Sequence, residues 1–536
     1  MKKIFLGLIS LMAVAPSMAQ ETYDNSPMFG KDLNGTARYV GMGGAMEALG
    51  ADISTSSTNP AGIGMMRHSS VSISGGLVSQ SGSNSSSVEY VNNSTTHASF
   101  DQMGFVYSAR TGRKNFINFG LNYHKSNNFN QLMYAISALD GNSAQNVGAY
   151  VMDMDYPNLN ERTNDPIINQ LNNNVINMNP TNTADANYYW TGGTRSIFQR
   201  NYSGYIGTFD LNISGNVNNR FYWGVSLGYS NVNYKQEGDY YEDLYLTTEK
   251  RDAYSQTPDN RKITGSGWDL KFGVIFRPVK ESPFRVGLYV NTPTLYDLKL
   301  EYEADLASSA WTDSPDDAYL SNTLRGTYRY EMRTPWKFGV SLGHTIGKEW
   351  AFGATYEYSD YSSTKFRIKD GSYSYSVYDD WGYYIGDTYY ETSRNDGEMN
   401  GHVSRTLKGV STLKLGVEYK PIPLMAVRLG YNYVSPMFDS NGYKDLFLDS
   451  NGAYYTTSTA YTNWKSTNRV TAGVGFFVSK WNFDLAYQYS QTNGDFYPFT
   501  TITGYTTDTE TINNIAPKVD VSNKRHQLIA TIGYTF

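Results

Sequence analysis

The chain has 536 residues, of which 15% are aromatic, and it contains 47 Tyr and 49 Gly. This composition favours many short strands over helices. Cysteine is absent, which excludes disulfide scaffolds, thiol catalysis and Cys-based zinc sites, and the net charge of -6 argues against a nucleic-acid partner. A mean hydropathy of -0.50 is compatible with a membrane barrel, because a barrel strand shows lipid only every second residue.

The first residues predict a secretory signal peptide over 1–19. Two lysines precede an apolar stretch at 4–14 that is too short to span a bilayer, and the small residues Ser17 and Ala19 occupy positions -3 and -1 of a cleavage site before Gln20. The alternative is an anchor helix, which the short apolar stretch disfavours. No other run of 18 apolar residues occurs in the sequence.

Apolar and polar residues alternate through most of the remaining chain. In residues 221–230 one face carries Phe, Trp, Val, Leu and Tyr, while the other carries Tyr, Gly and Ser. Aromatic residues crowd the ends of such apolar faces, as in the girdles of outer-membrane barrels, and the opposite faces carry charges such as Asp269, Lys271 and Glu418. We therefore predict an all-β fold, a transmembrane antiparallel β-barrel. A soluble sandwich, whose regular face would be a core, is the alternative.

About fourteen strands are predicted in a barrel over 69–536, with short turns alternating with long polar loops. The strands lie near 69–79, 99–110, 115–125, 202–216, 220–235, 263–278, 283–302, 325–346, 349–369, 406–420, 424–440, 466–478, 481–496 and 524–536. The loops are 80–98, 126–201, 236–262, 303–324, 370–405, 441–465 and 497–523. The even count places both termini on the periplasmic side and the long loops outside the cell.

Residues 20–68 precede the first strand and show no alternation. They are rich in Gly but also carry many apolar residues, which a disordered tail would lack. We therefore predict a plug, or hatch, folded into the barrel lumen. Gly41, Gly43 and Gly44 have no strand–helix frame around them, so they do not indicate a nucleotide loop; they give the plug backbone room to turn.

Residues 126–201 form the longest of the predicted loops. Leu132, Met133, Ile136 and Leu139 have weak helical spacing, and a second set of this kind follows at 167–176. The region predicts a structured cap, and these four apolar residues are candidates for capturing an apolar ligand.

No arrangement of residues points to catalysis. The six His form no H-x-x-x-H pair and lie in no nucleophile elbow, and the loop acids do not follow the pattern of a calcium loop. We predict no enzymatic activity, no metal site and no cofactor.

Two motifs resemble the N-terminal hatch of the FadL-type outer-membrane transporters. They are residues 35–45, GTARYVGMGGA, and the later Asn59-Pro60-Ala61; the strand phrases 333–339 and 427–436 are also similar to the family. The resemblance implies a fourteen-stranded barrel that admits long-chain fatty acids or aromatic hydrocarbons. It also implies that Asn59, Pro60 and Ala61 lie in a hatch coupled to an opening in the barrel wall. From the residues alone, Asn-Pro is a rigid turn that needs no such role.

The final strand, which ends in Tyr534 and Phe536, resembles the signal that the barrel-assembly machinery reads. The insertions 126–201 and 370–405 depart from the family pattern, because they are long and polar where the family builds its external ligand groove. The resemblance therefore leaves the identity of the substrate open.

The sequence predicts a monomeric channel of the cell outer membrane for passive uptake of hydrophobic small molecules. Its expected partners are outer-membrane lipid, the ligand and the assembly machinery. One alternative is a PorV-like barrel for secretion or surface-protein attachment, because long loops rich in Tyr, Gly and Asn suit protein contacts. Haem acquisition is a weaker alternative, since the scattered Tyr and His show no ligand spacing.

Overall fold

The structure of the protein is a computed structural model. It describes residues 21–84, 92–147, 150, 192–246, 251–305, 307–309, 319–320, 324–378, 384–448, 450, 456–506 and 511–536. The predicted signal peptide and the second helical set at 167–176 lie outside these residues.

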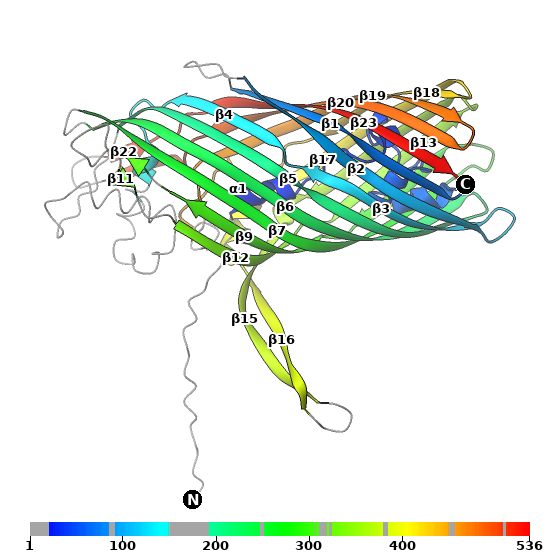
Figure 1. The fold of residues 1–536 in the computed structure, drawn as a ribbon, viewed down its shortest axis with the longest axis horizontal. Coiled ribbons are helices and arrows are strands. Elements are labelled where there is room, and N and C mark those ends of the chain that lie inside the picture. Colours follow the sequence, from blue (N-terminus) through cyan, green and yellow to red (C-terminus); the bar gives the residue numbers. More distant parts are fainter. Residues whose placement is uncertain are drawn as a thin grey trace, which may run out of the picture.

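The strands form one closed antiparallel barrel (Figure 1). Its elements are β1 (Ser70–Asn84), β2 (Asn92–Arg110), β3 (Phe116–Asn128), β4 (Gln131–Ala138), β5 (Gly192–Val217), β6 (Phe221–Leu246), β7 (Arg251–Phe276), β8 (Arg285–Asn291), β9 (Leu295–Ala304), β12 (Leu324–Arg333), β13 (Lys337–Ile346), β14 (Trp350–Asp360), β15 (Lys365–Tyr378), β17 (Gly409–Ile422), β18 (Met425–Val434), β19 (Tyr461–Val478), β20 (Trp481–Tyr497) and β23 (Val519–Thr535). β1 closes the barrel on β23, from Ser70 opposite Thr535 to Asn84 opposite Val521. Four strands are interrupted, namely β3/β4, β8/β9, β12/β13 and β14/β15, so the barrel has 14 strands and the predicted fold is confirmed.

The C-terminus lies at one end of the barrel (Figure 1). The exposed large apolar residues form a belt around this end, where the short turns also lie. On β6 it runs from Phe221 to Tyr229, and on β20 from Trp481 to Tyr489, with every second side chain facing outward. Nine residues of a strand tilted by about 40° rise roughly 20–25 Å, close to the apolar band of about 25 Å in outer-membrane barrels. The belt therefore matches the thickness of a bilayer.

The inward positions of the same strands are polar. Asp269, Lys271, Glu357, Lys414 and Arg428 are all buried in the lumen. The barrel thus reverses the usual arrangement of a soluble core, as the alternation in the sequence predicts.

Three predicted loops are largely regular structure. Residues 236–262 are not a long loop, because β6 and β7 continue to Leu246 and from Arg251. The two strands stay paired far above the belt, since buried rings such as Tyr234 and Tyr240 keep their inner face packed. Most of the predicted loop 80–98 belongs to β1 and β2, which leaves only a short connection between them. The predicted loop 370–405 contains a hairpin and a helix. The remaining small elements are β10 (Ala307–Ser308), β11 (Tyr319–Leu320), β16 (Tyr384–Asn395), β21 (Ile502–Thr506), β22 (Thr511–Asn514), η5 (Tyr361–Ser363) and α5 (Gly397–Thr406).

The helical prediction at 132–139 is wrong. These residues form β4, which pairs with β5 from Gln131 opposite Tyr202 to Ala138 opposite Arg195. Four apolar residues are too few to distinguish the 3.6-residue period of a helix from the two-residue period of a strand. The ladder with the long β5 satisfies the backbone hydrogen-bonding groups of β4, so the strand forms.

The N-terminal segment fills the lumen. It consists of α1 (Thr22–Asn25), η1 (Ser26–Met28), α2 (Ala37–Gly41), η2 (Ile53–Ser57) and η3 (Pro60–Met65), seen as short blue helices inside the strands in Figure 1. Most of its side chains are buried. Among the described helices of the chain, none has the length and apolarity needed to cross a membrane.

Candidate functional site in the plugged lumen

The luminal segment has two parts that meet the barrel wall in different ways. We name residues 36–66 the plug body and residues 21–34 the strap. The plug body packs against the belt-level half of the lumen, and the strap crosses the lumen above it.

The Asn-Pro-Ala motif is a buried turn at the start of η3. The Asn59 side chain accepts a hydrogen bond from the amide of Ala61 at 3.2 Å and donates one to the carbonyl of Glu47 at 3.0 Å. Pro60 occupies the first helical turn, and Ala61 packs against Tyr222 and Ile275 of the wall. The motif therefore fixes one corner of the plug body to β6 and β7.

The predicted hatch glycines place the end of α2 against the wall. Gly43 has φ +62°, and a Cβ built there would lie 2.8 Å from the backbone nitrogen of Tyr431. Gly44 also has a positive φ, and a Cβ on Gly41 would lie 3.4 Å from Gly473. At Gly43 both the backbone conformation and the close approach to β18 require glycine.

Buried ion pairs hold the plug body to the wall. Arg38 contacts Glu418 at 3.1 Å, and Arg428 bridges the same carboxylate at 2.7 Å to Asp484 at 2.5 Å. A second cluster joins Glu47 of the plug to Lys414 at 2.8 Å. Such pairs are costly to break, because removal of one partner leaves an uncompensated buried charge.

The strap is held by charge at its two ends and by apolar contacts between them. Near its start, Asp24 pairs with Arg261 and lies 3.3 Å from Lys444. At its other end, Asp32 lies 3.0 Å from Arg525 and 4.0 Å from Arg469.

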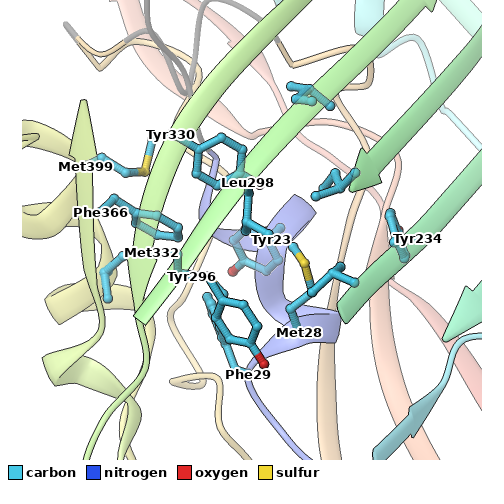
Figure 2. Close-up of a cluster of buried hydrophobic side chains, with 14 of the residues drawn as sticks. Tyr23, Met28, Phe29, Tyr234, Tyr296, Leu298, Tyr330, Met332, Phe366 and Met399 are labelled. Carbon is cyan, nitrogen blue, oxygen red and sulfur yellow. The ribbon is translucent and has the colours of Figure 1, made fainter. Parts of the chain in front are cut away.

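Tyr23, next to Asp24, joins an apolar cluster on the inner wall together with Met28 and Phe29, which lie between the two ends. Figure 2 shows these side chains facing Tyr296, Leu298, Tyr330, Met332, Phe366 and Met399. The Tyr330 hydroxyl also donates to the Asn25 side chain at 2.5 Å.

Two cavities lie on either side of the strap. The first, of about 250 Å³, is lined by aromatic rings and by three arginines. Its rings are Tyr23, Phe129, Phe198, Tyr202, Tyr234, Tyr461, Trp464 and Phe496, and its arginines are Arg200, Arg469 and Arg525. The second, of about 260 Å³, carries four bases in its lining, namely Lys31, Lys337, Lys414 and Arg469. The cavities share Ser26, Pro27 and Asp32 of the strap, so the strap lies between them.

Both cavities carry more bases than acids. Arg200 is paired with Asp259, Lys414 with Glu357, and the two arginines near Asp32 share that carboxylate. Within the described part of the chain, Lys31 has neither a hydrogen bond nor an ion pair. Burial lowers the pKa of Lys31 to about 8.

A seam in the barrel wall adjoins the first cavity. The β2–β3 ladder ends where Gln102 pairs with His124, although β2 continues to Asn92. Beyond the break at 129–130, β4 turns away from β2 and its Leu132 backbone bonds to Gln80 of β1 at 2.9 and 3.3 Å. We name the unpaired stretch between 92–101 and 125–138 the seam.

Side chains close the seam from within. Lys125 donates to the Ser99 hydroxyl at 2.8 Å, and Asn34 of the strap donates to Asp101 and to the Lys125 carbonyl, both at 3.0 Å. Outside, an apolar groove of about 410 Å³ lies beside the seam. It is lined by Val71, Phe100, Met103, Gly104, Phe105, Leu121, Tyr123 and Phe209.

The four residues that the sequence suggests for ligand capture are not exposed on the surface of the barrel. Met133, Ile136 and Leu139 are buried, and Met133 and Leu139 belong to an apolar cluster that also includes Phe198 and Phe496. Leu132 is half-buried and lines a separate recess. Tyr534 and Phe536 lie at the belt, with their rings 5.1 Å apart and Phe536 exposed to the surroundings of the barrel.

The arginines of the first cavity were not singled out from the sequence. Arg200, Arg469 and Arg525 occupy inward positions of β5, β19 and β23, above the belt. One signal in the sequence could have identified them. Each of these strands carries a lysine or arginine at an inward-facing position, beyond the point where its outward-facing residues stop being apolar. Over the residues that the structure describes, no group of three or more His, Asp or Glu could hold a metal ion.

No family model matches the sequence, and no curated protein matches it. Solved structures do resemble the chain. A FadL homologue of Pseudomonas aeruginosa has 12% identity and a TM-score of 0.51, over 95% of this chain and 99% of that one. The toluene transporter TodX of Pseudomonas putida has 11% identity and a TM-score of 0.46, over 95% and 100% of the two chains. The toluene transporter TbuX of Ralstonia pickettii has 12% identity and a TM-score of 0.44, over 94% and 99%. The closed barrel with its luminal N-terminal segment and the match to the FadL homologue together give this chain a FadL-type fold.

Proposed function

We propose that this protein is an outer-membrane channel for passive uptake of hydrophobic molecules that carry an acidic head group. The proposal rests mainly on the two cavities on either side of the strap, which are lined by aromatic rings and by basic side chains. Aromatic rings suit an apolar chain, and arginine suits a carboxylate.

Movement of the strap is part of the proposal. Ligand pockets usually measure about 300–1,000 Å³. Each cavity alone falls below that range, at about 250 and 260 Å³, whereas the two joined would reach it. A ligand of ordinary size therefore needs the strap to move.

A ligand carboxylate can take the place of Asp32. That side chain holds the strap to Arg525 and lies near Arg469, and both arginines line the first cavity. An incoming carboxylate on the same arginines would free this end of the strap, and the unpaired Lys31 beside it supplies a further positive charge. The exchange needs no energy source beyond the ligand gradient.

The exit that we propose is the seam. Release of Asn34 from Asp101 would remove one of the contacts that close the seam from within and leave the bond between Lys125 and Ser99 to be broken. A ligand could then pass to the apolar groove on the lipid side, whose walls are almost entirely apolar side chains.

Transport into proteoliposomes tests the function. Labelled long-chain carboxylate should enter vesicles that hold the protein, and the double variant Arg469→Gln, Arg525→Gln should lower that rate at least about tenfold, the value of one lost charged hydrogen bond. Uptake of a neutral aromatic hydrocarbon should change little. Arg325→Gln, an exposed base on the outer wall, is the matched control. Negligible flux of both compounds, with and without residues 20–68, would refute the channel.

A cross-link tests the exit. The chain has no cysteine, so Ser99→Cys and Lys125→Cys can be joined by a short cleavable thiol reagent without background. Uptake should stop on cross-linking and return on cleavage. The control pair Tyr107→Cys and Phe119→Cys, which face each other on the intact ladder, should leave uptake unchanged. Full uptake through a cross-linked seam would exclude this exit.

A second candidate function is attachment of a surface protein. β15 and β16 form a hairpin that projects away from the barrel (Figure 1). Deletion of residues 371–392 would then abolish attachment and leave uptake intact.

A further inference from the structure

The short turns at the belt end of the barrel are basic. Each of the six carries a lysine or arginine at or beside it: Lys114, Arg220, Lys280, Lys348, Lys420 and Lys480. The only acids of these turns are Glu281 and Glu349. The whole chain has a net charge of -6, so this end of the barrel differs in sign from the rest.

These bases lie at the border of the apolar belt. Phe221 follows Arg220, Val279 precedes Lys280 and Trp481 follows Lys480, and all three apolar side chains are exposed. The Lys480 ammonium lies 5.9 Å from the ring of Tyr534, which also faces outward. Bases beside interfacial aromatic residues lie at the level of lipid head groups.

Arg220 and Lys420 have partners within the protein, because Arg220 donates to the Pro278 carbonyl and Lys420 lies 3.7 Å from Glu418. The Arg277 guanidinium also donates to the Ser282 carbonyl at 3.0 Å and stabilises its turn. Four of the six bases are lysines whose ammonium groups form no hydrogen bond and no ion pair with any residue that the structure describes. They are Lys114, Lys280, Lys348 and Lys480. Four cations that form neither a hydrogen bond nor an ion pair within the described residues, spread over four turns, are available to an external anion.

We propose that this basic ring binds the phosphate groups of anionic phospholipids in the periplasmic leaflet. Its distribution favours lipid over protein, because the bases follow the whole circumference, whereas a protein partner would meet one side. Juxtamembrane bases attract anionic lipid by roughly 1 kcal/mol each, about fivefold in affinity. The inference rests on the position of the barrel in a bilayer and does not depend on the transport activity.

Lipid retention tests the ring. Full-length protein in detergent would be offered equal amounts of phosphatidylglycerol and phosphatidylethanolamine, and the retained lipids would be counted by mass spectrometry. Wild-type protein should retain phosphatidylglycerol in at least about fivefold excess at low salt, and the excess should shrink at high salt.

A fourfold variant separates the ring from general charge. Replacement of Lys114, Lys280, Lys348 and Lys480 by Gln should remove the excess, whereas Gln at Lys262, Lys299, Arg325 and Arg329 of the extracellular wall should preserve it. Equal retention of the two lipids by wild-type protein would overturn the proposal even if the variant failed to fold. An undiminished excess in a folded ring variant would overturn it as well.

Discussion

The plug body and the strap occupy one lumen but differ in what surrounds them. The plug body meets the wall through Glu47, which is fully buried beside Lys414, through Arg38, which pairs with the buried Glu418, and through glycines that bring the two backbones into contact. The strap has a cavity on each side, and its Asp32 is 30% exposed in a carboxylate–arginine contact. Both are short irregular segments, so secondary structure does not account for the difference.

The contrast separates a fixed element from a movable one. Desolvated charges hold strongly, because neither partner can return to water without opening the plug. A carboxylate that is partly exposed beside a cavity can be replaced by water or by another anion at little cost. We therefore expect the plug body to stay in place during transport while the Asp32 end of the strap moves, because the other end is held by the buried pair of Asp24 and Arg261.

The largest effect is expected when the plug body loses a buried charge. Glu418→Gln leaves Arg38 and Arg428 without their common partner and should lower the free energy of unfolding by about 3–5 kcal/mol. Urea unfolding in detergent measures this, and single-channel recording should show an ion leak as the plug loosens. The control is Glu301→Gln, an exposed partner of Lys262, whose effect should stay below about 1 kcal/mol. Equal effects of the two variants would contradict a firmly held plug body.

A smaller effect is expected at the glycine that meets the wall. Gly43→Ala forces a side chain into a left-handed conformation, at a cost of about 1–2 kcal/mol, and places its Cβ against the backbone of Tyr431. Gly30→Ala in the strap is the matched control, because a Cβ there would meet nothing within 4 Å. Heat-modifiability on gels should show a lower transition for the first variant alone. A neutral Gly43→Ala would indicate that the plug backbone adapts.

The sequence predicts the barrel far better than the site. Period-2 alternation is a local signal, so each of the 14 strands is found near its predicted place, and the interruption at 292–294 does not hide the strand 283–302. The strand ends are missed, because β6 and β7 remain paired where their outer faces become polar and the alternation fades. A turn such as Asn59-Pro60 is visible as a motif, since its geometry depends on adjacent residues.

The cavity arginines could not be predicted, because the site depends on contacts between distant parts of the chain. Asp32 and Arg525 are 493 residues apart, and no pattern in either segment indicates the other. The seam depends likewise on β4 turning toward Gln80 of β1. Helical spacing in 132–139 misleads for the same reason, since β5 and not the local sequence determines its conformation.

A modest change in ligand affinity is expected from Asp32→Asn in the strap. The substitution weakens the strap's bond to Arg525 and removes the carboxylate that competes with the ligand, so long-chain carboxylate should bind about fivefold more tightly, or about 1 kcal/mol. Isothermal titration calorimetry measures the affinity. Asp243→Asn, which breaks an exposed pair with Arg195, should leave it unchanged. Weaker binding by Asp32→Asn would show that the carboxylate assists the ligand and does not compete with it.

The smallest effect concerns pH and Lys31. Because burial lowers its pKa to about 8, this ammonium is charged at neutral pH and loses its proton above that value, while a ligand carboxylate stays ionised. Carboxylate affinity should therefore be constant between pH 6 and 7 and fall a few fold by about pH 9. The effect of pH on stability is opposite to its effect on affinity. Between about pH 8 and the ordinary lysine pKa, the unfolded chain binds more protons than the folded chain, so the free energy of unfolding increases as pH rises.

Two substitutions distinguish Lys31 from other groups that titrate in this range. Lys31→Met should give a low affinity that no longer varies with pH, and Lys31→Arg should extend the high-affinity plateau beyond pH 9, because arginine keeps its charge. A neutral aromatic hydrocarbon should show no pH dependence with any of the three proteins. If the wild-type and Lys31→Met profiles coincide, the positive charge that draws the ligand past the strap comes from Arg469 and Arg525 alone, and the second cavity serves as a passage and not as a binding site.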